Sequence, residues 1–405
     1  MIILLYIFIL FAAFFEYNIP YLNYWDEVVF FICVIYLIYL VIKKGKIKKS
    51  GFKLFFVINI LMIVGIIGTL INPTYQINKI AILKDIVAYL KFPITYLAFP
   101  SILNSFKLNR KYIGIRIITK IIVITIFIFM VMGYFVDIGL YEREEDRLLK
   151  TFSFIFPHPT FLVFSCLIMA IVLMITGNKF KKTYLLMCLS IMFMTQRSKA
   201  YFIIAFILVL FIIPSKFLDN LFDLKNNKII FKKRYLLLGT VLASLLMYLF
   251  AKDKFILYFR YGLTAARPAL YLIGLKLAYE HFPIGTGFGT FASSLSGRYY
   301  SSIYYDYGIS NVLGISEDDI SYIGDVYWPY IYGQFGIIGL ILQFRILLSL
   351  FFYYFKKINN IINRKGYIII WIYSIFASLA EAFYTNSTAV QMAFVISLCL
   401  LINND

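Results

Sequence analysis

Long apolar stretches dominate this sequence and decide what it can fold into. A helix that crosses the hydrocarbon core of a bilayer needs about 20 mostly apolar residues. Because the apolar residues here are continuous rather than alternating, the pattern excludes a strand-built membrane barrel. The sequence therefore predicts an all-α polytopic membrane protein with about twelve transmembrane helices, near residues 2–15, 28–42, 54–71, 86–103, 113–136, 159–176, 183–195, 200–214, 235–251, 326–352, 367–383 and 387–402.

Composition agrees with this prediction and excludes a soluble enzyme. Hydrophobic residues make up 62% of the 405 residues and charged residues only 15%, whereas a soluble domain carries about 25% charged residues. The four cysteines lie inside apolar runs without CxxC spacing, so we expect neither a disulfide framework nor a metal site. The first run lacks a basic leader and a cleavage motif, which predicts that it is a retained first helix. We expect a single integral membrane domain over residues 1–405.

Basic residues are distributed unevenly among the segments between these helices. Alternate segments hold most of the Lys and Arg, and the acids gather in the opposite set. Because cytoplasmic loops are enriched in Lys and Arg, both termini are predicted to be cytoplasmic. The formal charge of +19 is then mainly a topology signal, and no nucleic-acid partner is expected. The basic segments are 43–53, 107–120, 179–182, 216–234 and 356–365.

One segment, residues 252–325, is much longer than the other loops and falls on the external side of this topology. Long connections in compact proteins usually carry function. A helix is predicted over residues 268–279, because a proline suits the first turn and Leu270, Ile273 and Leu277 follow at helical spacing. We therefore expect one large external loop before the tenth helix, with its own local structure.

Residues 147–160 bring a cation and a histidine to the point where an external loop meets the sixth helix. Arg147 is a candidate phosphate ligand. His158 stands between Pro157 and Pro159, which restrict the backbone on both sides, and is a candidate for hydrogen bonding or proton transfer. The alternative is a helix-start turn with a histidine at the membrane interface, and the sequence leaves both readings open.

The hairpin at residues 195–199, with the sequence Thr-Gln-Arg-Ser-Lys, also falls on the external side. Two cations in a short external turn run against the usual charge distribution of membrane proteins. They could reach lipid headgroups or bind an anionic group at the membrane surface. We favour the anion for Arg197, because a guanidinium group suits phosphate oxygens.

Arg260 and Arg267 are seven residues apart, which is about two helical turns. They would share one face if residues 261–266 were helical, and could then clamp a pyrophosphate through charge-assisted hydrogen bonds. Salt bridges to Asp253 or Glu280 are the competing interpretation.

A glycine-rich turn and a carboxylate complete the set of candidates. Residues 283–291 contain GxGxG without a preceding strand, so a nucleotide site is rejected. The glycines would instead permit a tight turn whose amides approach a phosphate or another chain segment. Asp325 stands at the outer mouth of the tenth helix, where an acid could act as a general base.

Taken together and in this order, four blocks of the sequence resemble the family of O-antigen polymerases (Wzy type) and O-antigen ligases (WaaL type). The blocks are Arg147 with His158-Pro159-Thr160, Gln196-Arg197-Ser198, Arg267 with the turn at 283–291, and Asp325 with residues 334–339. The resemblance implies a GT-C-like fold in the bacterial cytoplasmic membrane. It also implies metal-independent and cofactor-free transfer of a glycan, on the outer face, from a polyprenyl-diphosphate-linked donor to an acceptor hydroxyl.

The resemblance also assigns roles to residues of this chain. Many ligases have a histidine near the position of Asp325, so the aspartate here favours a polymerase that acts on a lipid-linked acceptor. A ligase and a lipid-linked oligosaccharide flippase are the alternatives. The implied partners are donor and acceptor oligosaccharides, membrane lipid and a chain-length regulator protein. The implied site comprises Asp325, His158 and Glu280 for catalysis, Arg147, Arg197, Arg260, Arg267 and Arg298 for the diphosphate, and Tyr299, Tyr300, Tyr304 and Tyr305 for the glycan.

Overall fold

The protein is an all-α structure, as predicted. The computed structural model describes residues 2–44, 49–106, 112–142, 149–177, 181–212 and 260–402, together with Tyr248 and Ile256. Within these ranges, strand structure is limited to β1 (Tyr141–Glu142) and β2 (Thr151–Phe152), which pair antiparallel. The helices of the first half are α1 (Ile2–Leu10), α2 (Ala12–Asn18), η1 (Pro20–Tyr24), α3 (Trp25–Lys44), α4 (Lys49–Ile71), α5 (Lys79–Ser105), α6 (Tyr112–Phe135), α7 (Pro159–Ile175), α8 (Lys181–Met194) and α9 (Ser198–Ile212).

The second half contains short helical turns together with longer helices. They are η3 (Gly262–Thr264), α12 (Ala266–Glu280), α13 (Ser294–Arg298), α14 (Ile303–Asp306), α15 (Tyr327–Phe355), α16 (Ile361–Ala377) and α17 (Ser387–Leu401). Helices occupy every predicted apolar run except 235–251, of which only Tyr248 is described. Five of the described helical segments are long and apolar enough to cross a membrane, and α7, α8, α9 and α17 are shorter apolar helices. The chain is therefore a multi-pass membrane protein.

Helix α6 shows how the helices divide between protein and lipid. Its isoleucines at 113, 117, 121 and 128 follow one helical face and are exposed, whereas Val123 on the opposite side is fully buried. An exposed stripe of large apolar side chains is unfavourable in water and favourable in hydrocarbon. The outward face of α6 is therefore suited to contact lipid.

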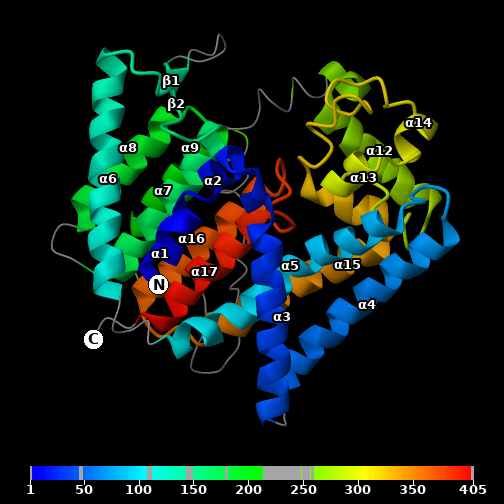
Figure 1. The fold of residues 1–405 in the computed structure, drawn as a ribbon, viewed down its shortest axis with the longest axis horizontal. Coiled ribbons are helices and arrows are strands. Elements are labelled where there is room, and N and C mark those ends of the chain that lie inside the picture. Colours follow the sequence, from blue (N-terminus) through cyan, green and yellow to red (C-terminus); the bar gives the residue numbers. More distant parts are fainter. Residues whose placement is uncertain are drawn as a thin grey trace.

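Figure 1 shows two groups of helices joined by α3 and α5. On one side, α6 to α9 lie beside α1, α16 and α17; on the other, α4 and α15 lie beneath the elements α12 to α14. Helix α5 packs against both α3 and α17, and α15 packs against both α4 and α12. The C-terminal half of the chain thus contributes to both groups.

The glycine turn at residues 285–289 is built into the helix bundle. Helix α15 is interrupted at Gly336, whose φ of +63° and ψ of −161° are not helical. The carbonyl oxygens of Gly333 and Gln334 accept hydrogen bonds from the backbone amides of Thr286 and Gly287, at 3.1 and 2.8 Å. Backbone groups at an interrupted apolar helix need such replacement partners. The turn therefore contacts another chain segment, which is one of the two alternatives left open by the sequence.

Helices α4 and α5 hold the same turn from the other side. The Phe288 amide donates to Thr69 Oγ1 at 2.8 Å, and the Gly289 amide donates to Asp85 Oδ2 at 2.8 Å. Gln76 Nε2 donates to the Gly289 carbonyl oxygen at 2.9 Å. The described part of the predicted long loop, residues 260–325, is therefore folded and packed on the bundle, and its helix α12 confirms the helix predicted over residues 268–279.

We expect Gly287→Ala to destabilise the protein far more than Gly308→Ala. Both glycines have positive φ, +97° and +68°, which costs a residue with a Cβ about 1–2 kcal/mol. A Cβ at Gly287 would also lie 2.1 Å from the Thr69 amide nitrogen, whereas a Cβ at Gly308 would meet nothing within 4 Å. Thermal unfolding in detergent should show a small loss for Gly308→Ala and a loss of at least about 3 kcal/mol, or no folded protein, for Gly287→Ala. Equal effects would contradict this account of the turn.

Cysteine labelling tests the predicted sidedness. The four native cysteines are buried, so an impermeant maleimide should leave the wild-type chain unlabelled. We expect intact cells to label Leu313→Cys, at a position that is 77% exposed in the segment predicted to be external. We expect Lys43→Cys, at the predicted cytoplasmic end of α3, to be labelled only after the cells are opened. The reverse pattern would overturn the topology.

Candidate functional site

Five charged side chains from four separate segments form what we call the charged centre: Arg197, Lys199, Arg267, Asp325 and Glu381. Arg267 Nη2 lies 2.8 Å from Asp325 Oδ2, and Lys199 Nζ forms an ion pair with Glu381. The two pairs are close together, because Lys199 is within electrostatic reach of Arg197 and Arg267, and Asp325 is within reach of Glu381. The structure thus brings three predicted residues, Arg197, Arg267 and Asp325, into one place.

Contacts between α12 and α15 position the first ion pair. Arg267 is the second residue of α12, and Asp325 precedes the first residue of α15 by two positions. The two helices pack along their length, and Tyr332 Oη donates to the Tyr271 carbonyl oxygen at 3.0 Å. Each side chain of the pair is 32% exposed. The ion pair is therefore held by the scaffold and remains open to a ligand.

The loop between α16 and α17, residues 378–386, positions Glu381. Trp328 Nε1 donates to Ser378 Oγ at 3.1 Å, and Tyr271 Oη donates to the Leu379 carbonyl oxygen at 2.7 Å. These two bonds attach the loop to α15 and α12, the helices associated with Asp325 and Arg267. The loop that carries Glu381 and the helices that carry its neighbours are consequently one connected unit.

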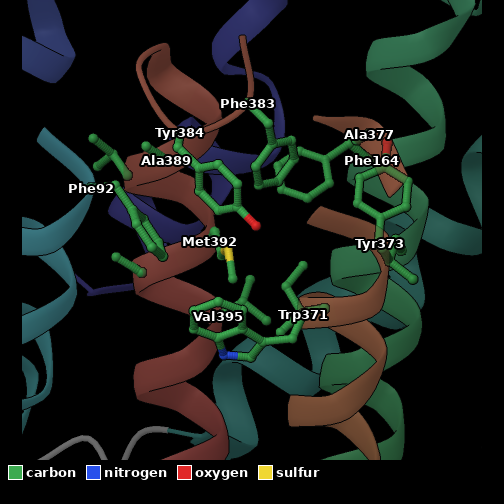
Figure 2. Packing of buried hydrophobic residues seen from close by; sticks show 14 of the residues in the cluster. Phe92, Phe164, Trp371, Tyr373, Ala377, Phe383, Tyr384, Ala389, Met392 and Val395 are labelled. Carbon is green, nitrogen blue, oxygen red and sulfur yellow. The ribbon is translucent and has the colours of Figure 1, made fainter. Parts of the chain in front are cut away.

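Aromatic packing also holds the loop at residues 378–386 in place. Figure 2 shows Phe383 and Tyr384 pointing from the loop into a cluster formed by side chains of α5, α7, α16 and α17. The Phe383 ring lies 5.3 Å from the Phe164 ring, and the Tyr384 ring lies 4.9 Å from the Phe92 ring. Burying two rings immediately after Glu381 restricts where the carboxylate can lie.

The hairpin between α8 and α9 supplies the remaining cations. Gln196 has a φ of +51°, which turns the chain sharply before α9 begins at Ser198. Phe202, one turn into α9, stacks on Phe376 of α16 with ring centroids 4.0 Å apart. This packing places Lys199, whose side chain is 11% exposed, against Glu381.

The charged centre combines three cations with two carboxylates, so its formal charge is +1. Burial raises the pKa of the Asp325 carboxyl, and the adjacent Arg267 opposes that shift. Such a group is a better proton acceptor than an ordinary surface aspartate. The arrangement is suited to bind a multiply charged anion next to a basic carboxylate.

Sequence reasoning missed Glu381. The apolar run was predicted to extend to residue 383, but α16 ends at Ala377 and Glu381 lies in the following loop. The available signal was an acid near the end of a predicted apolar helix, because ionisable groups within such helices usually mark a functional site.

Within the described residues, the structure does not pair the other predicted diphosphate ligands with the charged centre. Arg147 is outside the described residues. Arg260 and Arg298 are exposed, and within the described ranges no ion pair joins either to the charged centre. The condition for Arg260 and Arg267 to share a helix face is not met, because Ala265 is extended (φ −111°, ψ 139°) and separates η3 from α12.

His158 caps a helix, and Glu280 lies far from Arg267 along α12. His158 is exposed at the N-cap of α7, where its Nδ1 accepts a hydrogen bond from the Thr160 amide at 3.3 Å. This agrees with the helix-start alternative. Glu280 ends α12, thirteen residues from Arg267, which corresponds to about 20 Å along the helix. Arg267 pairs with Asp325 rather than with Glu280.

The four predicted glycan-binding tyrosines differ in exposure. Tyr304 is fully buried, and its hydroxyl bonds the Ser296 hydroxyl at 2.6 Å and the Ala292 amide at 3.0 Å. Its ring belongs to the packing of the segment and not to its surface. Tyr305 is 55% exposed, whereas Tyr299 and Tyr300 are partly buried.

Neither comparison with known proteins nor metal-site geometry assigns a function. A scan against models of protein families and searches of curated proteins and solved structures found no match. Among the described residues, no group of three or more His, Cys, Asp or Glu side chains is placed to hold a metal ion.

The two ion pairs of the charged centre should differ in their effect on stability. Glu381→Gln leaves the largely buried Lys199 ammonium without its partner, which should cost about 3–5 kcal/mol. Asp325→Asn breaks a pair whose side chains are both 32% exposed, so the expected loss is about 1 kcal/mol or less. Thermal unfolding of the purified variants in detergent measures both. A larger loss for Asp325→Asn would contradict the relative burial of the two pairs.

Proposed function

We propose that this protein is a polysaccharide polymerase that transfers a glycan from a polyprenyl-diphosphate-linked donor to a lipid-linked acceptor. The observation that carries the proposal is the charged centre itself, in which Arg197, Lys199 and Arg267 meet Asp325 and Glu381 beside apolar helices. A membrane enzyme that acts on a lipid diphosphate needs cations for the leaving group and a base for the acceptor. The ordered sequence blocks and their resemblance to O-antigen polymerases and ligases support the same reading.

The cations would stabilise the departing diphosphate. As the bond between the donor sugar and the diphosphate breaks, the electron pair stays on the phosphate oxygen and negative charge accumulates there. Guanidinium groups bind such oxygens in a two-pronged geometry, and preorganised charges at a developing anion are among the strongest catalytic contributions. Arg267 and Arg197 are suited to this role, and Lys199 adds a third positive charge.

Asp325 would accept the proton of the acceptor hydroxyl as its oxygen attacks the anomeric carbon. In the resting structure Arg267 is engaged with this carboxylate. A diphosphate that binds Arg267 competes for the same donors and releases Asp325 beside the reacting sugar. Donor binding would thus supply the base, which explains why a cation and a carboxylate that pair with each other both belong to one site.

The finer parts of this proposal rest on the sequence. They are twelve transmembrane helices in a GT-C-like arrangement, a bacterial cytoplasmic membrane, cytoplasmic termini and a polymerase rather than a ligase. The aspartate in place of a histidine near the tenth helix favours the polymerase. A reaction with two lipid-linked repeat units should give a lengthened lipid-linked product, whereas a ligase would need a lipid A core acceptor.

One observation favours a second function, the transport of a lipid-linked oligosaccharide. Lys91, near the middle of α5, forms a buried ion pair with Asp26 of α3, and its ammonium also lies 3.4 Å from Glu27 Oε1. Buried ionisable groups within apolar helices are frequent in transport pathways. A flippase would move the labelled lipid across proteoliposome membranes without lengthening its glycan.

We expect Arg267→Ala to lower the transfer rate about 100-fold or more, because one stabilising donor is lost where charge develops. Arg267→Lys should restore part of the rate, since the charge returns without the planar fork. Lys356→Ala is the control, because Lys356 is an exposed cation at the opposite end of α15. Lengthening of a fluorescent lipid-linked glycan in detergent measures all three. Full activity of folded Arg267→Ala would refute the proposed leaving-group role.

The pH dependence of transfer tests Asp325. Burial raises the pKa of this carboxyl, so transfer should decline on acidification at a pH above the ordinary aspartate value of about 3.9. Below that pKa the carboxyl is protonated and cannot accept the proton of the acceptor. Asp325→Asn should be at least about 100-fold slower and should lack this acidic decline. An unchanged pH profile in the variant would move the base to Glu381 or another residue.

A further inference from the structure

A second group of polar side chains lies at the far end of α12 from the charged centre. It comprises Tyr75, Lys276, Glu280, His281 and Tyr307, and we call it the distal cluster. Tyr75 Oη lies 3.2 Å from His281 Nε2, and Tyr307 Oη donates a hydrogen bond to Glu280. Lys276 Nζ lies 3.8 Å from Glu280 Oε1 and 5.1 Å from the centroid of the Tyr307 ring. The loop between α4 and α5, the end of α12 and the residue after α14 thus meet at one surface.

Backbone contacts hold this cluster in place. The carbonyl oxygen of Tyr75 accepts hydrogen bonds from Ser301 Oγ at 2.8 Å and from the Ser302 amide at 3.3 Å. The Tyr75 and His281 rings meet edge to face with centroids 5.4 Å apart. Hydrogen-bonding groups whose positions are set in advance lose little entropy when a ligand binds.

The charge of the distal cluster is balanced. The charges of Lys276 and Glu280 cancel, and partial burial lowers the pKa of His281, which favours the neutral imidazole. The Glu280 carboxylate can accept several hydrogen bonds and uses one on Tyr307. The surface is therefore rich in donors and acceptors, in contrast to the charged centre, and carries no net charge to attract a phosphate.

Exposed aromatic rings occur within the same stretch of chain. Tyr279 is 84% exposed and Phe282 is 70% exposed, on either side of Glu280 and His281. Exposed rings offer flat apolar faces, and a ligand with apolar faces edged with hydroxyl groups can use both the rings and the neighbouring hydrogen-bonding groups. Sugar rings combine these two properties.

We propose that the distal cluster is a binding subsite for uncharged sugar units of the glycan, remote from the reacting bond. This inference rests on the proposed function, because it takes the diphosphate to bind near Arg267. The separation of about 20 Å along α12 means that the subsite would hold sugars several units away from the transferred linkage. It would thereby select donors or acceptors by the identity of their distal sugars.

Binding of two separate probes tests the subsite. The first is the fluorescently labelled oligosaccharide that mild acid releases from the lipid-linked intermediate of the producing cells, and the second is inorganic pyrophosphate. The test variant is the double substitution His281→Phe with Tyr307→Phe, which keeps the rings and removes the hydrogen bonds. Tyr322→Phe, at a 44% exposed tyrosine of the same segment, is the matched control.

We expect the double variant to bind the oligosaccharide at least about tenfold more weakly and to bind pyrophosphate as the wild type does. The Tyr322→Phe control should bind both probes normally, and Arg267→Ala should lose pyrophosphate and keep the oligosaccharide. If the double variant unfolds at the same temperature as the wild type, its weaker binding is not caused by lost folding. The two single variants, each with a smaller loss of oligosaccharide affinity, give a second check.

The two proposals fail in different ways. Wild-type protein that binds pyrophosphate but not the oligosaccharide, or a double variant that binds the oligosaccharide normally, overturns the subsite and leaves the proposed function standing. Oligosaccharide binding that depends on the distal cluster without any pyrophosphate binding supports the subsite and contradicts the diphosphate site. If the double variant loses only its affinity for phospholipid vesicles, the rings serve the membrane and the subsite is overturned.

Discussion

The interruption of α15 at Gly336 is the constraint on which much of the structure depends. Two carbonyl groups at this break have no partner within the helix, and leaving them unsatisfied in apolar surroundings costs several kcal/mol each. The amides of Thr286 and Gly287 fill that role, and the glycines of the turn allow the backbones to approach. Helix α15 and the segment that begins with α12 therefore depend on each other in the folded structure. This coupling places the start of α12, with Arg267, beside the start of α15, with Asp325.

The charged centre shows how a membrane protein can keep cations ready near apolar helices. Isolated charges there would be expensive, and pairing with carboxylates lowers that cost. The same pairing means that an anionic ligand must compete with Asp325 for Arg267. Under the proposed function, such a site would discriminate against weakly charged ligands, and Asp325 would become available when a strongly charged ligand binds. Helix α12 then separates a charged end, suited to a diphosphate, from a neutral end, suited to sugars.

The sequence was most informative where a single segment carries the signal. The apolar runs predicted the helices because each run is long enough to satisfy its own backbone, and the spacing of Leu270, Ile273 and Leu277 predicted α12. Site residues whose placement depends on the backbone conformation next to them were less predictable. Arg260 and Arg267 do not share a helix face, because Ala265 is extended. Glu381 escaped notice because apolar residues continue past the end of α16, and hydropathy does not reveal where a helix stops.

The sequence alone determined the membrane location, the all-helical class, the approximate positions of the described apolar helices and three members of the charged centre. These properties depend on local composition and on hydrogen bonds within one helix, so they can be read along the chain. Only the tertiary structure decided which charges meet, that the glycine turn completes α15, and that Tyr304 is buried while Glu280 joins a separate cluster. The meeting of the charges and the packing of the glycine turn on α15 depend on contacts between residues more than 40 positions apart, such as Arg267 with Asp325 and Lys199 with Glu381. No local pattern encodes such contacts, because they arise only when helices with already satisfied backbones pack against one another.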